Sequence, residues 1–364
     1  MAEMKLKDVT VGMILDQDVL TPKGQLIASN GQTLTAQTLL HMSFYGIDII
    51  KVHYKDADQE PEKESPEVQQ AFETHTERIK KTPAFKAFKK DYTEQVNEMS
   101  NHLSDFINHN AALDSDKVLA SAKKVYNRDQ TSIGMLTMLH SMREIDDSTF
   151  AHSMNVSVIA RIIGEWVGLE EADLDILSLA GLLHDLGKSK IPQSIIGKPG
   201  RLTPEEFQII KKHPVYGYDI LKDEDIDLRI KLAALEHHEK CNGSGYPLGR
   251  DRSEISPFSS IIAIADIYDA MTANRCYRAG LCPFEVLADM QRNGMDWFPP
   301  QFLLPFLAGI ADSYIDSSVL LSDGRKGRIV QVPRAALTRP LVMCDDGTFV
   351  ALAENTALTI SAIL

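Results

Sequence analysis

The sequence predicts a mainly α protein, with an all-helical central domain between a small N-terminal α+β module and a small C-terminal β appendage. Apolar residues recur at three- and four-residue steps through the middle of the chain, which is the period of an amphipathic helix. Short apolar runs broken by turn residues occupy both ends, as is typical of small strands. A charged stretch with prolines separates the first module from the rest.

The N-terminal module is expected over residues 1–55. Its runs VGMIL, DVL, LIA and IDIIKVHY are separated by turn residues and predict short strands, and residues 35–45 predict a helix. Residues 56–66 are charged and almost without apolar side chains, so we expect a linker there. We interpret the module as regulatory.

Residues 67–143 consist mostly of good helix formers, with Val96, Met99 and Leu103 at helical spacing. We expect a helical connector in this region. Its helices either pack on the central domain or join two copies of the chain as a homodimer, and plain packing is the favoured alternative.

The central helical domain is expected over residues 144–312. Helical periodicity is found in the segments 150–167, 174–186, 204–212, 228–238, 261–273 and 283–292. Five prolines fall between these segments rather than inside them, namely Pro192, Pro199, Pro214, Pro247 and Pro257.

The C-terminal β appendage is expected over residues 313–364. The runs SVLLSD, GRIVQV, RPLVMC and TFVAL predict strands, and Asp323-Gly324 and Asp346-Gly347 are turn signals between them.

The net charge of -13 opposes binding to long nucleic acid or to anionic membrane surfaces. A phosphate substrate would need metal ions and local cationic side chains to reverse this field. The four cysteines form no CxxC pair, which indicates a reducing compartment. The N-terminus lacks the apolar stretch of a signal peptide, and no segment has the roughly 20 apolar residues of a membrane span. We therefore expect a cytoplasmic protein.

Every histidine after residue 141 lies in a short polar cluster, and these are His152, His184, His213, His237 and His238. A single histidine on an apolar face is usually a hydrogen-bonded core residue. Five of them in one helical domain favour metal ligation instead.

Two aspartates occur in apolar surroundings. Asp185 follows the apolar run that ends at His184, and Asp266 interrupts an otherwise apolar helix. A buried carboxylate is costly unless a cation compensates it. A buried salt bridge is the alternative for Asp266. Imidazole and carboxylate ligands without thiolate suit iron, manganese or zinc, and the residue types do not choose among these three.

The pair His184-Asp185, extended by Leu186-Gly187-Lys188, resembles the HDxGK signature of the HD phosphohydrolase superfamily. His237-His238-Glu239 followed by the GSGYP stretch of residues 243–247 resembles the HHE and GYP elements of the HD-GYP family. The resemblance covers residues 149–308, with every motif in the family's order. It implies an HD-type catalytic domain.

The resemblance implies two or three transition-metal ions, with iron favoured and manganese second. It implies seven metal ligands, which are His152, His184, Asp185, His213, His237, His238 and Asp266. Asp185 would bridge two ions and would be catalytic together with Lys188. Lys188, Arg275 and Arg278 would contact the phosphates of cyclic di-GMP or a related cyclic dinucleotide.

The GYP stretch directly follows the histidine pair, so we expect Gly245, Tyr246 and Pro247 to contact substrate. As a sequence it would also serve as an ordinary tight turn. Tyr246 either stacks on a base or covers the core.

The expected reaction is hydrolysis of cyclic di-GMP to pGpG by a hydroxide that bridges two ions, and further to GMP if a third ion binds. Some positions depart from the family pattern. Asp147 and Ser148 stand where an acidic ligand of a third ion is expected, which leaves that ion open. Asn242 replaces an aspartate before the GYP stretch and Cys276 replaces a proline, which leaves the loop geometry and the substrate preference open.

Three alternatives compete with this interpretation. The domain could sense a cyclic dinucleotide with little turnover, although the intact ligand set argues against this. It could be another HD-superfamily enzyme, such as a nucleotidase or an iron-dependent oxygenase, against which the GYP stretch argues. Activity could also lie in a terminal module, but neither carries a catalytic constellation.

Overall fold

A computed structural model gives the fold of the chain. It describes residues 2–6, 9, 13–20, 26–34, 38, 42, 47, 49–53, 79–109, 111–126, 131–142, 148–198, 200, 202–272 and 281–364. The chain divides into two compact units, Met1–Ala71 and Phe72–Leu364. The linker expected over residues 56–66 and most of the helix expected over residues 35–45 lie outside the described residues.

The first unit contains short antiparallel strands, as its alternating sequence predicts. These are β1 (Ala2–Lys5), β2 (Ile14–Leu15), β3 (Val19–Leu20), β4 (Leu26–Ala28) and β5 (Ile49–His53). One sheet has the order β1-β5-β2, and β3 pairs with β4. Ile50 and Val52 of β5 point to the same face and are buried with Met13 and Leu15. This small core stabilises the unit.

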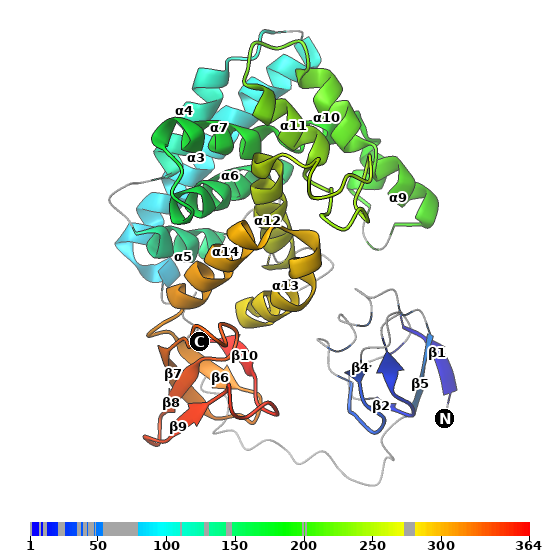
Figure 1. Ribbon diagram of the computed structural model, residues 1–364, viewed down its shortest axis with the longest axis vertical. Coiled ribbons are helices and arrows are strands. Elements are labelled where there is room, and N and C mark those ends of the chain that lie inside the picture. The colour runs from blue at the N-terminus through cyan, green and yellow to red at the C-terminus, as the bar shows by residue number, and fades with distance from the viewer. Residues whose placement is uncertain are drawn as a thin grey trace. The chain divides into compact units, whose positions relative to one another are not determined.

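The second unit begins with a helical domain (Figure 1). Its helices are α3 (Pro83–His109), α4 (Ser115–Val125), α5 (Ser132–Met142), α6 (Thr149–Trp166), α7 (Glu171–Leu183), the 3-10 helix η3 (Leu186–Lys190), α8 (Gln193–Ile196), α9 (Pro204–Ile210), α10 (His213–Leu221), α11 (Leu228–Glu236), α12 (Pro257–Thr272), α13 (Pro283–Trp297) and α14 (Pro300–Ser313). The prediction of a mainly α protein with small strand modules at both ends is confirmed.

Helices α8, α10 and α14 were not among the helical segments predicted from the sequence. Pro214 lies in the first turn of α10, where a helix does not need the missing backbone N–H. Pro305 lies inside α14, and prolines also begin that helix. The interpretation of Pro214 as a residue between helices is therefore wrong, and so is that of Pro257, which is the first residue of α12.

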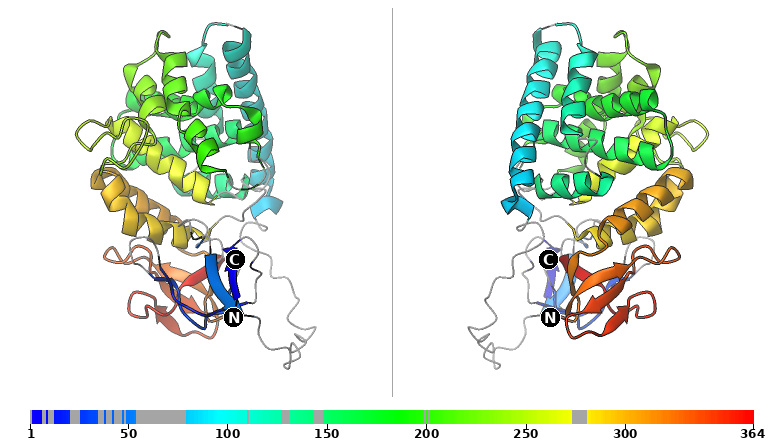
Figure 2. Two further views of the ribbon diagram at one scale, coloured as in Figure 1. Left: turned by 90° about the vertical axis from the view of Figure 1, so that its right-hand side faces the viewer. Right: turned by 90° about the vertical axis from the view of Figure 1, so that its left-hand side faces the viewer.

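Helices α6, α7 and α12 form the centre of the domain. Nearly every residue of α6 from Ala151 to Gly164 is buried, so this helix is surrounded by others. Gly181 of α7 lies directly against the backbone of Ser157 in α6, and a Cβ atom at this position would overlap it. The two helices therefore approach each other closely. Figure 2 shows α3 running along one side of this bundle.

The C-terminal part is one antiparallel sheet in the order β10-β6-β7-β8-β9. Its strands are β6 (Ser318–Leu321), β7 (Lys326–Gln331), β8 (Leu341–Cys344), β9 (Phe349–Ala351) and β10 (Ile360–Ile363). The sheet lies at the end of the helical domain beside α13 and α14 (Figures 1 and 2). Val319, Leu321 and Ile329 join the hydrophobic core of the helices. The four predicted strands are present, and β10 is additional.

The exact domain boundaries and a homodimer through residues 67–143 stay predictions. Within the part of the chain that is described, no helix combines the length and the apolar character needed to cross a lipid bilayer.

Candidate metal centre

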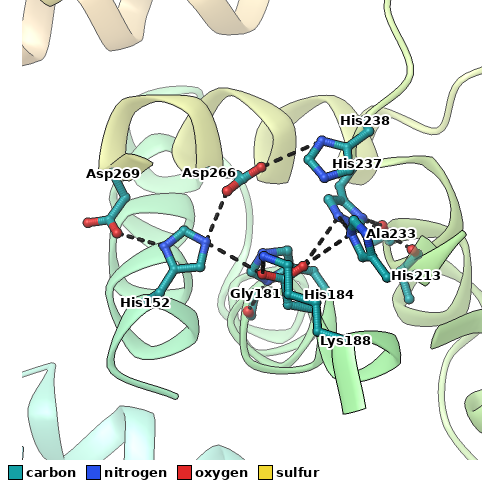
Figure 3. Close-up of polar contacts among 12 residues, drawn as sticks. His152, Gly181, His184, Lys188, His213, Ala233, His237, His238, Asp266 and Asp269 are labelled. Carbon is teal, nitrogen blue, oxygen red and sulfur yellow. Dashed lines mark hydrogen bonds and ion pairs between the residues drawn. The ribbon is translucent and has the colours of Figure 1, made fainter. Parts of the chain in front are cut away.

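The five histidines and two aspartates expected to bind metal lie together at the centre of the helical domain (Figure 3). They come from the following places: His152 in α6, His184 and Asp185 directly after α7, His213 at the start of α10, His237 and His238 directly after α11, and Asp266 in α12. Residues that are up to 114 positions apart in the sequence (266 − 152) are thus neighbours in space.

The HDxGK segment, residues 184–188, connects two helices. Helix α7 ends at Leu183, and the 3-10 helix η3 begins at Leu186. Gly187 lies so close to α10 that a Cβ atom would overlap the carbonyl oxygen of His213 and the backbone nitrogen of Gly217. The absence of a side chain at position 187 lets η3 pack on α10. This contact brings Nε2 of His213 to 3.3 Å from Oδ1 of Asp185.

Four of the histidine rings use Nδ1 as a hydrogen-bond donor. His152 donates to Asp269 at 2.7 Å, His184 to the carbonyl of Gly181 at 2.7 Å, His213 to the carbonyl of Ile210 at 2.7 Å, and His237 to the carbonyls of Ala233 and Ala234 at 3.1 Å each. A carbonyl only accepts, so the proton of the neutral ring is on Nδ1. The Nε2 atoms of His184, His213 and His237, whose partners are carbonyls, then carry lone pairs, as in the histidine ligands of metal sites.

Two of these Nε2 atoms, those of His213 and His237, lie next to each other, and neither ring has a proton there to donate to the other. Nε2 of His213 lies 3.1 Å from Nε2 of His237, an arrangement that is repulsive without a cation. Nε2 of His184 and Oδ1 of Asp185 are buried and have no hydrogen-bond partner among the described residues. Buried polar atoms are rarely left in this state. The donor set therefore fits metal ions.

The residues form three sets, and within each set the possible ligand atoms lie within 4.8 Å of one another. The sets are His213, His237 and His238; His152, His184 and Asp266; and His184, Asp185 and His237. The third set joins the other two. All three consist of imidazoles and carboxylates, the ligand types that suit iron, manganese or zinc.

Electrostatics keeps two of the imidazoles neutral. Burial lowers the pKa of His237 well below its usual value and lowers the pKa of His238 to about 3. Burial also opposes protonation of His152, but hydrogen bonds with Asp266 and Asp269 outweigh it and raise its pKa to about 9. Without metal, a proton on His152 compensates the charge of Asp266.

The two carboxylates stay ionised although they are buried. Burial acts to raise the pKa of Asp185, but the nearby charge of Lys188 lowers it well below the usual range. For Asp266, the hydrogen bond with His152 likewise outweighs burial and lowers the pKa. Anionic oxygens next to neutral imidazoles are what a divalent cation binds.

The GYP loop is held by Glu239, for which the sequence analysis assigned no role. Its carboxylate accepts hydrogen bonds from the backbone N–H groups of Leu248 (2.6 Å), Gly249 (3.1 Å) and Arg250 (3.0 Å). Gly245 lies directly on the backbone of Glu239 and leaves no room for a Cβ atom. The loop therefore folds back onto the residues that follow the histidine pair.

This folding places Tyr246 against the metal centre. Its ring stacks on that of His238, with centroids 4.6 Å apart and 27° between the planes. The backbone N–H of Tyr246 also donates to the backbone carbonyl of His238 at 3.1 Å. Burial raises the pKa of the Tyr246 hydroxyl. Asn242 accepts from the N–H of Ser244 at 3.1 Å, so it closes the turn as an aspartate would.

Lys188 forms an ion pair with Asp185 and thus lies beside the cluster. Ser148 caps α6, since its hydroxyl accepts from the N–H of Ala151 at 3.1 Å. Asp147, Arg275, Cys276 and Arg278 lie outside the described residues.

Two further residues contribute to the site without having been assigned a role from the sequence. Asp269 orients His152. The sequence feature that could have indicated this role is its position one turn after Asp266 on the same helix. Lys211, two residues before His213, reaches over the ring of Tyr246. No sequence pattern indicated that contact.

The family described as HD domain matches residues 117–302 of the chain. Similar curated proteins include a cyclic di-GMP phosphodiesterase of Pseudomonas aeruginosa, which is 32% identical over 57% of this chain and 50% of that protein. A cyclic di-GMP phosphodiesterase of Thermotoga maritima is 35% identical over 48% of this chain and 47% of that protein. A 3′3′-cGAMP-specific phosphodiesterase of Vibrio cholerae is 38% identical over 40% of this chain and 32% of that protein.

The chain spans half or less of the length of these three relatives. The family match extends over more than half of the 364 residues and includes every residue of the cluster from His152 to Asp266. The chain belongs to the HD domain family.

Proposed function

We propose that this protein is a metal-dependent phosphodiesterase that hydrolyses cyclic di-GMP to the linear dinucleotide pGpG. The observation that carries the proposal is the convergence of unprotonated Nε2 atoms on the buried carboxylate of Asp185. The names of the relatives from Pseudomonas aeruginosa and Thermotoga maritima support the choice of substrate.

The seven clustered residues would hold two adjacent transition-metal ions, with iron favoured and manganese second. Asp185 lies between the two histidine groups, with Oδ1 at 3.3 Å from Nε2 of His213 and Oδ2 at 3.7 Å from Nε2 of His152. It is therefore the carboxylate suited to bridge two ions. When bound, such ions lower the pKa of a water molecule that attacks phosphorus and neutralise charge on the phosphate.

The protein's own side chains would bind and orient the substrate. Lys188 is held beside the cluster by its ion pair with Asp185, so its ammonium group can donate to a phosphate oxygen as negative charge grows there. Tyr246 closes one side of the site by stacking on His238, and Gly245 and Pro247 set the position of that ring. Arg275 and Arg278 are proposed as further phosphate contacts.

A second substrate, 3′3′-cGAMP, is favoured by a different observation. The Vibrio cholerae relative that carries this name is 38% identical to the aligned part of this chain. The two substrates share the phosphodiester chemistry and differ in one base, so the metal cluster would act on both. If a third ion binds near Asp147 or Ser148, it would extend the reaction from pGpG to GMP.

The test combines metal analysis with identification of products. Protein purified without oxygen is analysed for bound metal and then incubated with cyclic di-GMP and, separately, with 3′3′-cGAMP. We expect bound iron or manganese and a linear dinucleotide product. Saturable binding without product would identify a sensor, and protein that neither contains nor acquires transition metal would refute the proposal.

A further inference from the structure

Lys211 occupies an unusual position at the edge of the candidate site. It caps the C-terminus of α9, two residues before His213. Its ammonium nitrogen lies 5.2 Å from the ring centroid of Tyr246 and 5.2 Å from that of Phe207. A cation at this distance is attracted by each aromatic face. The two rings therefore favour one direction for a long side chain that is otherwise flexible.

Within the described part of the chain, the hydrogen-bonding capacity of this ammonium group is available to a ligand. Among the described residues, Lys211 forms neither an ion pair with a carboxylate nor a side-chain hydrogen bond, whereas Lys188 is paired with Asp185. An ammonium group has three N–H donors. Lys211 is thus an oriented cation that can still bind an anion.

A chain of side-chain contacts connects the metal cluster to Lys211 through Tyr246. His238 is a member of the cluster, Tyr246 stacks on His238 with centroids 4.6 Å apart, and Lys211 lies next to Tyr246. An anion bound by Lys211 would therefore lie beside Tyr246, the ring that contacts the metal cluster.

We propose that Lys211 binds the second phosphate of a cyclic dinucleotide, the one that is not being cleaved. This inference rests on the proposed function. A cyclic dinucleotide carries two phosphodiester groups on opposite sides of one ring, so only one of them can occupy the metal centre. The other needs a cation at a distance, which a protein with a net charge of -13 must supply locally.

Lys211 would accordingly determine specificity rather than take part in the chemical step. Because the rings of Phe207 and Tyr246 already restrict its rotamers, binding costs less side-chain entropy than it would for a free lysine. The residue would favour substrates with two phosphates over phosphodiesters with one.

The test compares Lys211→Gln with the matched control Lys212→Gln, which removes the same charge from the adjacent, exposed position. Each metal-loaded protein is assayed with cyclic di-GMP and with bis(p-nitrophenyl) phosphate, which has a single phosphodiester. Losing a charge-assisted hydrogen bond should raise the KM of Lys211→Gln for cyclic di-GMP about tenfold, with kcat changed less than about twofold. Its activity on bis(p-nitrophenyl) phosphate should equal that of the wild type.

Two further measurements separate binding from catalysis. The affinity for a hydrolysis-resistant phosphorothioate analogue of cyclic di-GMP should fall about tenfold in Lys211→Gln and stay unchanged in Lys212→Gln. Lys211→Arg keeps the charge and should restore most of the affinity. The affinity of the wild type should decrease more steeply with ionic strength than that of Lys211→Gln.

An unchanged KM and affinity in Lys211→Gln would overturn the inference while leaving the proposed function in place. An equal loss of activity on both substrates would also overturn it, because Lys211 would then only support Tyr246. If the wild type neither binds nor hydrolyses a cyclic dinucleotide, the proposed function and this inference both fail.

Discussion

Asp269 lies on the opposite side of the His152 ring from the metal cluster. Its Oδ2 atom is 2.7 Å from Nδ1 of His152, while Nε2 of the same ring faces Asp266 at 3.0 Å (Figure 3). In the same cluster, His184, His213 and His237 instead donate from Nδ1 to backbone carbonyls. A carboxylate in this place fixes the ring orientation and makes Nε2 a stronger ligand.

Replacing Asp269 with Asn should lower the metal affinity or the activity by about 10- to 100-fold, because His152 loses its anionic partner. Metal titration and steady-state kinetics measure both quantities. Asp289→Asn is the control, since Asp289 is also a buried aspartate but belongs to α13. Full metal occupancy together with unchanged turnover in Asp269→Asn would contradict an orienting role.

Replacing Asp185 with Ala should abolish activity and reduce the metal content, since both histidine groups lose a shared carboxylate. Elemental analysis and product formation are measured on the same preparation. Asp219→Ala removes an exposed aspartate that pairs with Lys222 and should change neither. Wild-type activity in Asp185→Ala would refute the assignment of the site.

Replacing Gly187 with Ala should lower the free energy of unfolding by about 3 kcal/mol, because the new methyl group overlaps the backbone of α10. Metal retention should fall as well, since η3 and His213 would move apart. Gly217→Ala tests the opposite side of the same contact, where the nearest atom to a new Cβ is 3.4 Å away. Chemical denaturation should show little loss for that variant, and equal losses would argue against the packing explanation.

Replacing Glu239 with Gln should destabilise the protein by about 1–3 kcal/mol, because an amide cannot accept from all three backbone N–H groups of the loop. The KM should rise because Tyr246 is less firmly held, and the metal content should remain that of the wild type. Glu254→Gln changes an exposed carboxylate of the same loop and serves as the control. Loss of metal in Glu239→Gln would instead place Glu239 among the ligands.

The stability of chelator-treated protein should fall between about pH 6.5 and pH 4. Burial lowers the pKa of His237 and His238 in the folded state, so below the unfolded value of 6.5 the unfolded chain binds protons that the folded protein does not. Each such histidine contributes about 1.4 kcal/mol per pH unit. His152 acts in the opposite sense, since its raised pKa stabilises the fold below pH 6.5 and this contribution is lost as the pH rises through about 9.

Denaturation by guanidinium at several pH values measures this slope. His238→Gln should make it shallower by one histidine's contribution, whereas His109→Gln, at an exposed position of α3, should leave it unchanged. A slope that does not respond to His238→Gln would show that the ring is already protonated in the folded protein.

The sequence by itself determined the fold class and the candidate ligands. Helical periodicity predicted α6, α7, α11 and α12, because residues three and four positions apart share one helix face and interact locally. The family resemblance carried by the motifs around His184 and His237 implied the seven residues that the structure brings together. Helix α10 was missed because Pro214 in its first turn resembles a helix breaker.

Only the tertiary structure decided how those residues are oriented and supported. The pairing of His152 with Asp269 spans 117 positions and depends on how α6 packs against α12. The contact of Gly187 with α10, the anchoring of the loop by Glu239 and the position of Lys211 over Tyr246 depend likewise on helix packing and loop folding. Local sequence patterns record helix faces and turns, whereas contacts between distant segments arise only when the whole core packs.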